Sequence, residues 1–169
     1  MRHFKHVALS AAAGLAALLF CAPSASAATG TGTGPGPNPP REEVFQLVAK
    51  QTQGGLVDVD GSGGPSLGDE FVLSGNLFRG SLAVGTYSEI CTLTRFAPAD
   101  EFDLQCAADL ALSQGQLTVQ GRFTVTTAGP GNIDLAITGG TGRYRTAHGY
   151  VHAVNVSDTE SHLTVHLTL

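Results

Sequence analysis

The feature that most constrains the fold is a succession of short segments in which apolar and polar residues alternate. In residues 116–125, for example, Leu117, Val119, Phe123 and Val125 all occupy alternate positions. This period of two is typical of β-strands, and clusters of Gly, Pro, Asn and Asp separate the segments as turns would. Beyond residue 27, no window of about a dozen residues shows helical periodicity with helix caps. The predicted strands are 44–48, 71–78, 88–96, 104–112, 116–125, 133–138, 150–156 and 161–169.

The number and spacing of these strands predict an all-β domain that is either a barrel or a sandwich. Closure into a barrel removes exposed sheet edges, which are otherwise prone to pair with other chains. The last predicted strand reaches the final residue, Leu169. A strand at a chain end must be held by its neighbours to be ordered, so its position favours closure.

The N-terminal segment has the pattern of a secretory signal peptide. Arg2 and Lys5 precede an apolar run over residues 7–20, and small residues follow up to Ala27. This order of charge, apolar run and cleavage site predicts export, with residues 1–27 as the signal and an extracellular protein as the product. The run has about 14 residues and is shorter than the roughly 20 that span a membrane.

Two alternatives to cleavage remain open at the N-terminus. The segment could stay as an uncleaved membrane anchor, or Cys21 could carry a lipid. A lipid attachment site favours a small residue before the cysteine, whereas Phe20 stands there. We therefore expect no membrane association once the signal is removed.

The rest of the chain divides into a linker and one domain. Residues 28–41 are rich in Gly, Pro and Thr and lack large apolar side chains, which predicts a disordered linker. Residues 42–169 form the predicted β-domain. Asp and Glu number 14 against 9 Lys and Arg, and this acidic balance argues against nucleic acid as a partner.

Two cysteines remain after the signal, Cys91 and Cys106. Residues 96–101 read as a hairpin turn, which would place the cysteines nearly opposite each other on neighbouring strands. In an oxidising compartment this arrangement predicts a disulfide. The alternative is a pair of reduced thiols that line a cavity.

The segment 132–144 reads Asn-Ile-Asp-Leu-Ala-Ile-Thr-Gly-Gly-Thr-Gly-Arg-Tyr. A strand that ends in this Gly-Gly-Thr-Gly sequence with an aromatic after it resembles the allene oxide cyclase barrel and the plant dirigent proteins. Residues 66–69, 89–91 and 115–121 are similar to segments of that family in the same order. The resemblance covers approximately residues 44–169.

The resemblance implies an eight-stranded antiparallel β-barrel, a homotrimer, and an apolar cavity that needs no metal or organic cofactor. It implies that an apolar small molecule is the partner and that the cavity steers cyclisation or coupling of a reactive intermediate, as a cyclase-type isomerase or dirigent protein would. The alternative is a non-catalytic ligand-binding or cell-surface interaction protein on the same barrel.

The resemblance also suggests candidate cavity residues. The position of the family's first-strand glutamate matches Gln46, and a family asparagine lies one residue from Asn76. The cavity cysteine of the family matches Cys91, and the dirigent arginine matches His148. The first candidate cavity residues are Gln46, Asn76, Cys91 and Tyr144, and Tyr87 and His148 come next.

Two other patterns bear on metal binding. His148 and His152 are four residues apart, as are His162 and His166, so each pair shares one strand face. A cluster of all four could bind zinc or copper, but alternation with apolar residues favours a solvent-facing position. Residues 58–63 resemble part of a calcium loop but lack its glutamate at position twelve, so we interpret them as a glycine-rich turn. We therefore predict no metal site.

Overall fold

The computed structural model describes residues 41–98 and 100–169. The predictions for residues 1–27 and 28–40 lie outside this part of the chain. Within the described residues, no helix has the length and apolar character needed to cross a membrane.

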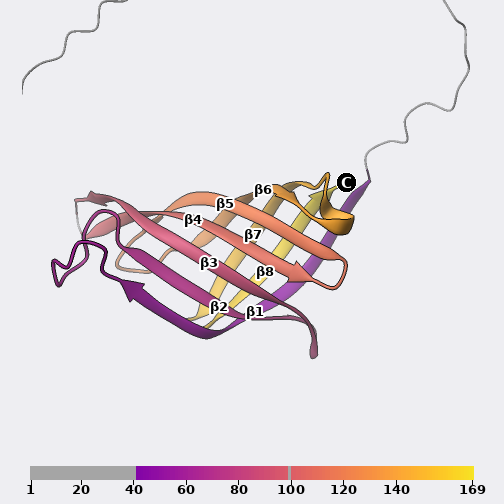
Figure 1. The fold of residues 1–169 in the computed structure, drawn as a ribbon, viewed down its shortest axis with the longest axis horizontal. Helices are drawn as coiled ribbons and strands as arrows, with labels where there is room; N and C mark the ends of the chain where they lie inside the picture. The colour runs from indigo at the N-terminus through magenta and orange to yellow at the C-terminus, as the bar shows by residue number, and fades with distance from the viewer. Residues whose placement is uncertain (1–40, 99) are drawn as a thin grey trace, which may run out of the picture. The chain divides into compact units, whose positions relative to one another are not determined.

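The domain is a closed barrel of eight antiparallel strands, in which each strand pairs with its neighbour in sequence and the first pairs with the last (Figure 1). The predicted fold class is therefore confirmed. The elements are β1 Glu42–Val57, β2 Glu70–Arg79, β3 Leu82–Ala97, β4 Glu101–Leu112, β5 Gly115–Val125, β6 Asn132–Gly140, a 3₁₀ turn η1 Gly142–Tyr144, β7 His148–Ser157 and β8 Glu160–Thr168.

Two strands extend at least six residues beyond their predicted bounds. β1 continues to Val57 rather than ending at residue 48, and β3 begins at Leu82 rather than residue 88. The extra part of β1 is polar and glycine-rich, so its sequence carries no strand signal. Pairing with β2 holds it in place, with a register shift between Gln51 and Gln53. Tertiary pairing here outweighs weak local propensity.

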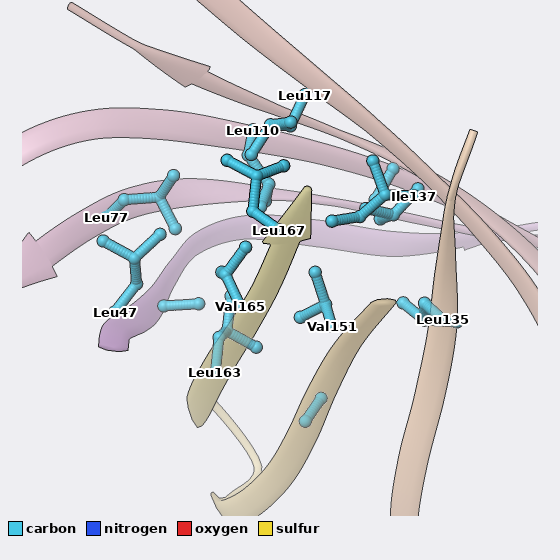
Figure 2. Close-up of a cluster of buried hydrophobic side chains, with 14 of the residues drawn as sticks. Leu47, Leu77, Leu110, Leu117, Leu135, Ile137, Val151, Leu163, Val165 and Leu167 are labelled. Atoms are coloured by element: carbon cyan, nitrogen blue, oxygen red, sulfur yellow. The ribbon is translucent and has the colours of Figure 1, made fainter. Parts of the chain in front are cut away.

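Alternating residues of every strand point into the barrel and form two apolar clusters. The larger includes Leu47, Leu77, Leu117, Val165 and Leu167, all buried (Figure 2). The smaller is built around Cys91, Leu93, Leu104 and Cys106. These clusters hold the strands that carry the site described below.

The Gly-Gly-Thr-Gly motif builds the connection from β6 to η1. The Thr141 amide donates a hydrogen bond to the Gln116 carbonyl at 2.8 Å, and the Arg143 amide donates to the Gln114 carbonyl at 2.9 Å. Gly142 has a φ of +58°, which glycine adopts at little cost. The motif therefore folds back onto β5 and the turn before it, and it buries Tyr144 against the larger cluster.

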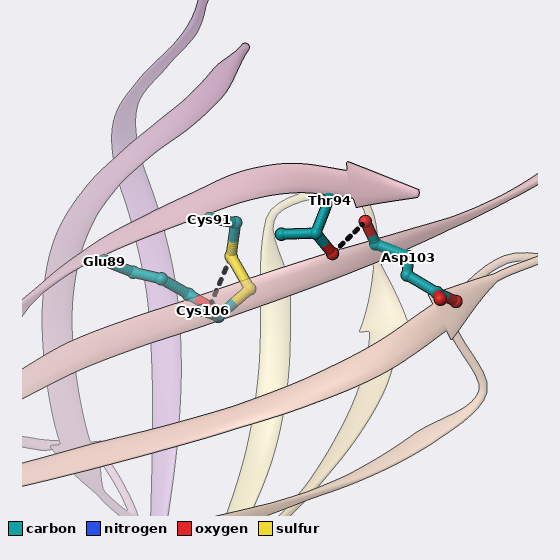
Figure 3. Close-up of a disulfide and its surroundings, with 5 residues drawn as sticks. All are labelled: Glu89, Cys91, Thr94, Asp103 and Cys106. Carbon is teal, nitrogen blue, oxygen red and sulfur yellow. Dashed lines mark hydrogen bonds between the residues drawn. A yellow bond between two sulfur atoms is a disulfide. The ribbon is translucent and has the colours of Figure 1, made fainter. Parts of the chain in front are cut away.

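The predicted disulfide joins Cys91 of β3 to Cys106 of β4 (Figure 3). The two residues are direct partners in the β3–β4 ladder, and the strands meet at a turn that follows Ala97. The bridge closes a loop with a sequence separation of 15. A loop of this size contributes about 3 kcal/mol to stability in the chain-entropy account.

Candidate ligand cavity

A cavity of about 530 Å³ opens at the end of the barrel where β5 turns into β6 and β7 turns into β8. Its mouth is formed by residues of these turns, including Pro130 and Asp158. In an up-and-down barrel, the β6–β7 connection that carries Tyr144 lies at the opposite end. The volume is within the range of about 300–1,000 Å³ that is typical of small-molecule sites.

The inner wall of the cavity is apolar and partly aromatic. Inward residues of β2, β4, β5, β6 and β8 supply it: Phe71, Leu73, Leu104, Phe123, Val125, Ile133 and Leu163. The disulfide forms part of the wall through Cys91 and leaves the cavity open. The fold thus fills one half of the barrel with side chains and leaves the other half free for a ligand.

Glu89 of β3 is the carboxyl group that lies among these apolar residues. Burial raises its pKa above the usual value for glutamate. Its Oε1 atom lies 3.2 Å from Cys91 Sγ (Figure 3). A disulfide sulfur carries no hydrogen, so a hydrogen bond across this contact requires the proton of a neutral Glu89 carboxyl. Burial therefore favours the protonated form of Glu89, and the contact with Cys91 Sγ is compatible with it.

Tyr87 lies two residues before Glu89 and therefore shares its inward face. Burial, and secondarily the charge of Glu89, raises the pKa of the Tyr87 phenol. The phenol consequently remains a hydrogen-bond donor over a wide pH range. Gln51 of β1 adds an amide to the same cavity.

Of the six candidate residues, Tyr87 and Cys91 line this cavity. Tyr144 is buried, but it is the last residue of η1 and packs in the larger cluster. Gln46 is exposed and Asn76 is half-buried on the outer face, because their neighbours Leu47 and Leu77 point inward. His148 is exposed, and its ring lies against the Thr146 carbonyl. The structure therefore does not bring Gln46, Asn76, Tyr144 and His148 to the cavity.

Glu89 and Gln51 were absent from the candidates that the sequence suggested. A signal for Glu89 was nevertheless present, because it lies two residues before Cys91 and so shares a strand face with it. No such signal existed for Gln51, since the polar part of β1 has no clear alternation.

Two groups of potential metal ligands occur among the described residues. The first combines Glu89 with Cys91 and Cys106, but both sulfurs belong to the disulfide and cannot bind as thiolates. The second combines Asp58, Asp60 and Asp69. Their carboxylates accept hydrogen bonds from backbone amides of residues 59–66, which fits a turn held by its own side chains.

The histidines of β7 and β8 form no such group within the described residues. His152 Nδ1 lies 2.7 Å from Asp134 Oδ1, and the ring of His166 stacks on Tyr150 with centroids 4.4 Å apart. These histidines thus interact with neighbours on the outer face of the barrel.

The domain is thus a closed up-and-down barrel with one end filled by side chains and one open apolar end. The interior of an eight-stranded barrel has room for one small ligand at most. The chain belongs to the allene oxide cyclase barrel like domain family, whose profile matches residues 46–169. The predicted resemblance is therefore confirmed. No curated protein sequence matches the chain.

Several solved structures share the fold. A pyocyanin demethylase has 24% sequence identity and a TM-score of 0.62, and the alignment covers 73% of this chain and 99% of that one. AbnU, an exo-specific intermolecular Diels–Alderase, has 14% identity, coverage of 76% and 99%, and a TM-score of 0.59. The pterocarpan synthase dirigent protein GePTS1 has 20% identity, coverage of 76% and 88%, and a TM-score of 0.58. At this identity, the similarity establishes a common fold.

Proposed function

We propose that this protein binds an apolar small molecule in the cavity and steers its cyclisation or coupling, with Glu89 as a general acid. The observation that carries the proposal is a buried carboxyl with a raised pKa in an apolar cavity of about 530 Å³. Solved relatives of this fold include a Diels–Alderase and pterocarpan synthase dirigent proteins, which supports this class of chemistry.

The chemistry follows from the environment of Glu89. A carboxyl that stays protonated can donate its proton to an oxygen or nitrogen of the ligand and promote bond rearrangement. The carboxylate that remains can stabilise the developing positive charge and then recover the proton. An intramolecular cyclisation of this kind is an isomerisation, so the elemental composition of the ligand does not change.

The barrel supplies the second part of the mechanism. Rigid strands hold the ligand in one folded conformation, and confinement lowers the entropic barrier to ring closure. The apolar walls also exclude water, which would otherwise intercept a reactive intermediate.

Binding in the cavity can be tested with 1-methylnaphthalene, a neutral fluorescent probe. Leu73→Trp fills the cavity, whereas Val72→Trp places the same ring on the outer face one residue away. We expect Leu73→Trp to weaken binding by at least about tenfold, which is roughly 1.4 kcal/mol. The Val72→Trp control should bind as the unchanged protein does. Equal binding by both variants would place the probe elsewhere.

Catalysis can be tested in the producing organism by untargeted mass spectrometry of the culture medium. A strain without the protein should lose one metabolite and accumulate an isomer of the same mass. The unchanged gene and Asp109→Asn, which alters an exposed carboxylate of β4, should restore the metabolite, whereas Glu89→Gln should not. Identical media in all strains would contradict the proposed catalysis.

Export and assembly form part of the same proposal. The pattern of residues 1–27 supports secretion, which predicts a mature protein in the medium that begins at Ala28. The resemblance to the family implies a homotrimer, which we propose for the mature protein. N-terminal sequencing of protein purified from the medium would test the cleavage site. Light scattering of the same protein would test the homotrimer.

A further inference from the structure

The charges around the cavity point to a particular kind of ligand. Every charged residue that lines it is acidic: Glu89 inside, and Asp158 and Glu160 at the mouth. Among the described residues that form its lining, none is Lys, Arg or His. The cavity therefore has no group that could neutralise a buried carboxylate on a ligand.

We infer that the cavity selects a cationic aromatic ligand, such as a quaternary or protonated nitrogen heterocycle, with Glu89 as its counter-ion, and disfavours carboxylates. This inference rests on the proposed function, because it specifies the ligand class of the same cavity. The pair of a ligand cation and an ionised Glu89 is the state that exists after Glu89 has given its proton to a nitrogen of a largely apolar ligand, and a quaternary cation imitates that state.

The groups that face Glu89 from each neighbouring element support this assignment. β2, β4, β5 and β6 contribute only apolar residues to the lining. On its own strand, Tyr87 contributes a neutral phenol. Glu160 of β8 contacts Lys50 at 3.0 Å and His162 at 3.3 Å. Lys50 and His162 lie outside the cavity and offset the negative charge of Glu160. Asp158 is exposed at the mouth and adds negative charge there.

Aromatic side chains add a second attraction for a cation. Phe71, Tyr87 and Phe123 all line the cavity. The face of an aromatic ring is negative and attracts a cation, most strongly where water is excluded. A cation without a carboxylate partner would be costly to bury, and so would an ionised Glu89 without a cation. Together the two charges compensate each other, so binding and ionisation of Glu89 are coupled.

This coupling predicts the direction of the pH dependence. In the free protein Glu89 keeps its proton to a higher pH than usual, and the bound cation lowers the pKa of Glu89. Between these two pKa values, binding releases one proton. The affinity for a cation should therefore rise by up to about tenfold per pH unit as the pH increases, and it should level off above the raised pKa.

Three probes of similar shape test the inference by fluorescence titration between about pH 4 and pH 8, the range in which carboxyl groups titrate. They are N-methylquinolinium, which is cationic, 1-methylnaphthalene, which is neutral, and 1-naphthoate, which is anionic. At the upper pH we expect the cation to bind at least about tenfold more tightly than the neutral probe, and the anion at least about tenfold more weakly.

Glu89→Gln should remove the preference for the cation and its pH dependence while the neutral probe still binds. Asp109→Asn removes one exposed carboxylate from β4. This variant should keep both the preference for the cation and its pH dependence. Binding of the neutral probe without preference for the cation, or a preference that persists in Glu89→Gln, would overturn the inference and leave the proposed function standing. Failure of all probes to bind would overturn the proposed function itself.

Discussion

The carboxyl groups of Glu89 and Asp103 are both shielded from solvent, yet their surroundings shift their pKa values in opposite directions. Glu89 faces apolar cavity walls, and burial raises its pKa. Asp103 of β4 lies on the outer side under two arginines, and hydrogen bonds from Arg95 and Thr124, with the charge of Arg122, lower its pKa from 3.8 to about 2. The first carboxyl is suited to proton transfer, whereas the second holds three strands together.

Asp103→Asn should lower the midpoint of urea unfolding at neutral pH, because a neutral amide at this position cannot form ion pairs with Arg95 and Arg122. A carboxyl whose pKa is lowered by folding stabilises the protein above its unfolded pKa. That contribution is lost as the pH falls from about 4 to about 2. The difference between the two proteins should therefore shrink over this range. A difference that stays constant would contradict the role of the ion pairs.

The β6–η1 connection shows how one element closes the filled end of the barrel. Its backbone is hydrogen-bonded to β5 and to the turn before it, and Tyr144 packs beneath it. Gly142 makes the close approach possible, because a Cβ atom there would lie 2.5 Å from the Gln114 carbonyl oxygen. The motif that indicated the family thus has a structural role at the end of the barrel away from the ligand cavity.

Gly142→Ala should lower the free energy of unfolding by at least about 1 kcal/mol, because alanine at positive φ is strained. The contact with Gln114 adds to this cost. Gly55→Ala is the matched control, since its added Cβ would have no atom within 4 Å and its φ is not in the positive range. Urea unfolding followed by circular dichroism measures both. Equal stability of the two variants would show that the connection adapts easily.

The barrel as a whole closes through the pairing of β1 with β8. This closure brings the ends of the domain together: the Leu169 amide donates to the Arg41 carbonyl at 3.0 Å, and the Arg41 amide donates back at 3.3 Å. Among the described residues, no strand is left as an edge. The order of the chain around the barrel could therefore be changed without altering the strand pairing.

A circular permutant tests this property. A short glycine linker would join residue 169 to residue 41, and new ends would be placed at Gly80 and Ser81, which are exposed between β2 and β3. This site is at the end of the barrel away from the cavity, so we expect 1-methylnaphthalene to bind within about twofold of the original affinity. Loss of cooperative unfolding would mean that the β2–β3 hairpin must be continuous.

The sequence by itself determined the strands with clear alternation, the all-β class, the disulfide and the residues of the glycine motif, because each depends on local pattern or short spacing. The pattern alone left a barrel and a sandwich open, and the resemblance to the family indicated the barrel. It did not determine the length of β1, whose polar half pairs mainly with β2, or which residues reach the cavity. Gln46 and Asn76 were suggested by alignment with a family, yet a shift of one position along a strand turns a side chain to the other face. Only the tertiary structure placed Glu89 inside the open end, because burial depends on what the neighbouring strands bring against it.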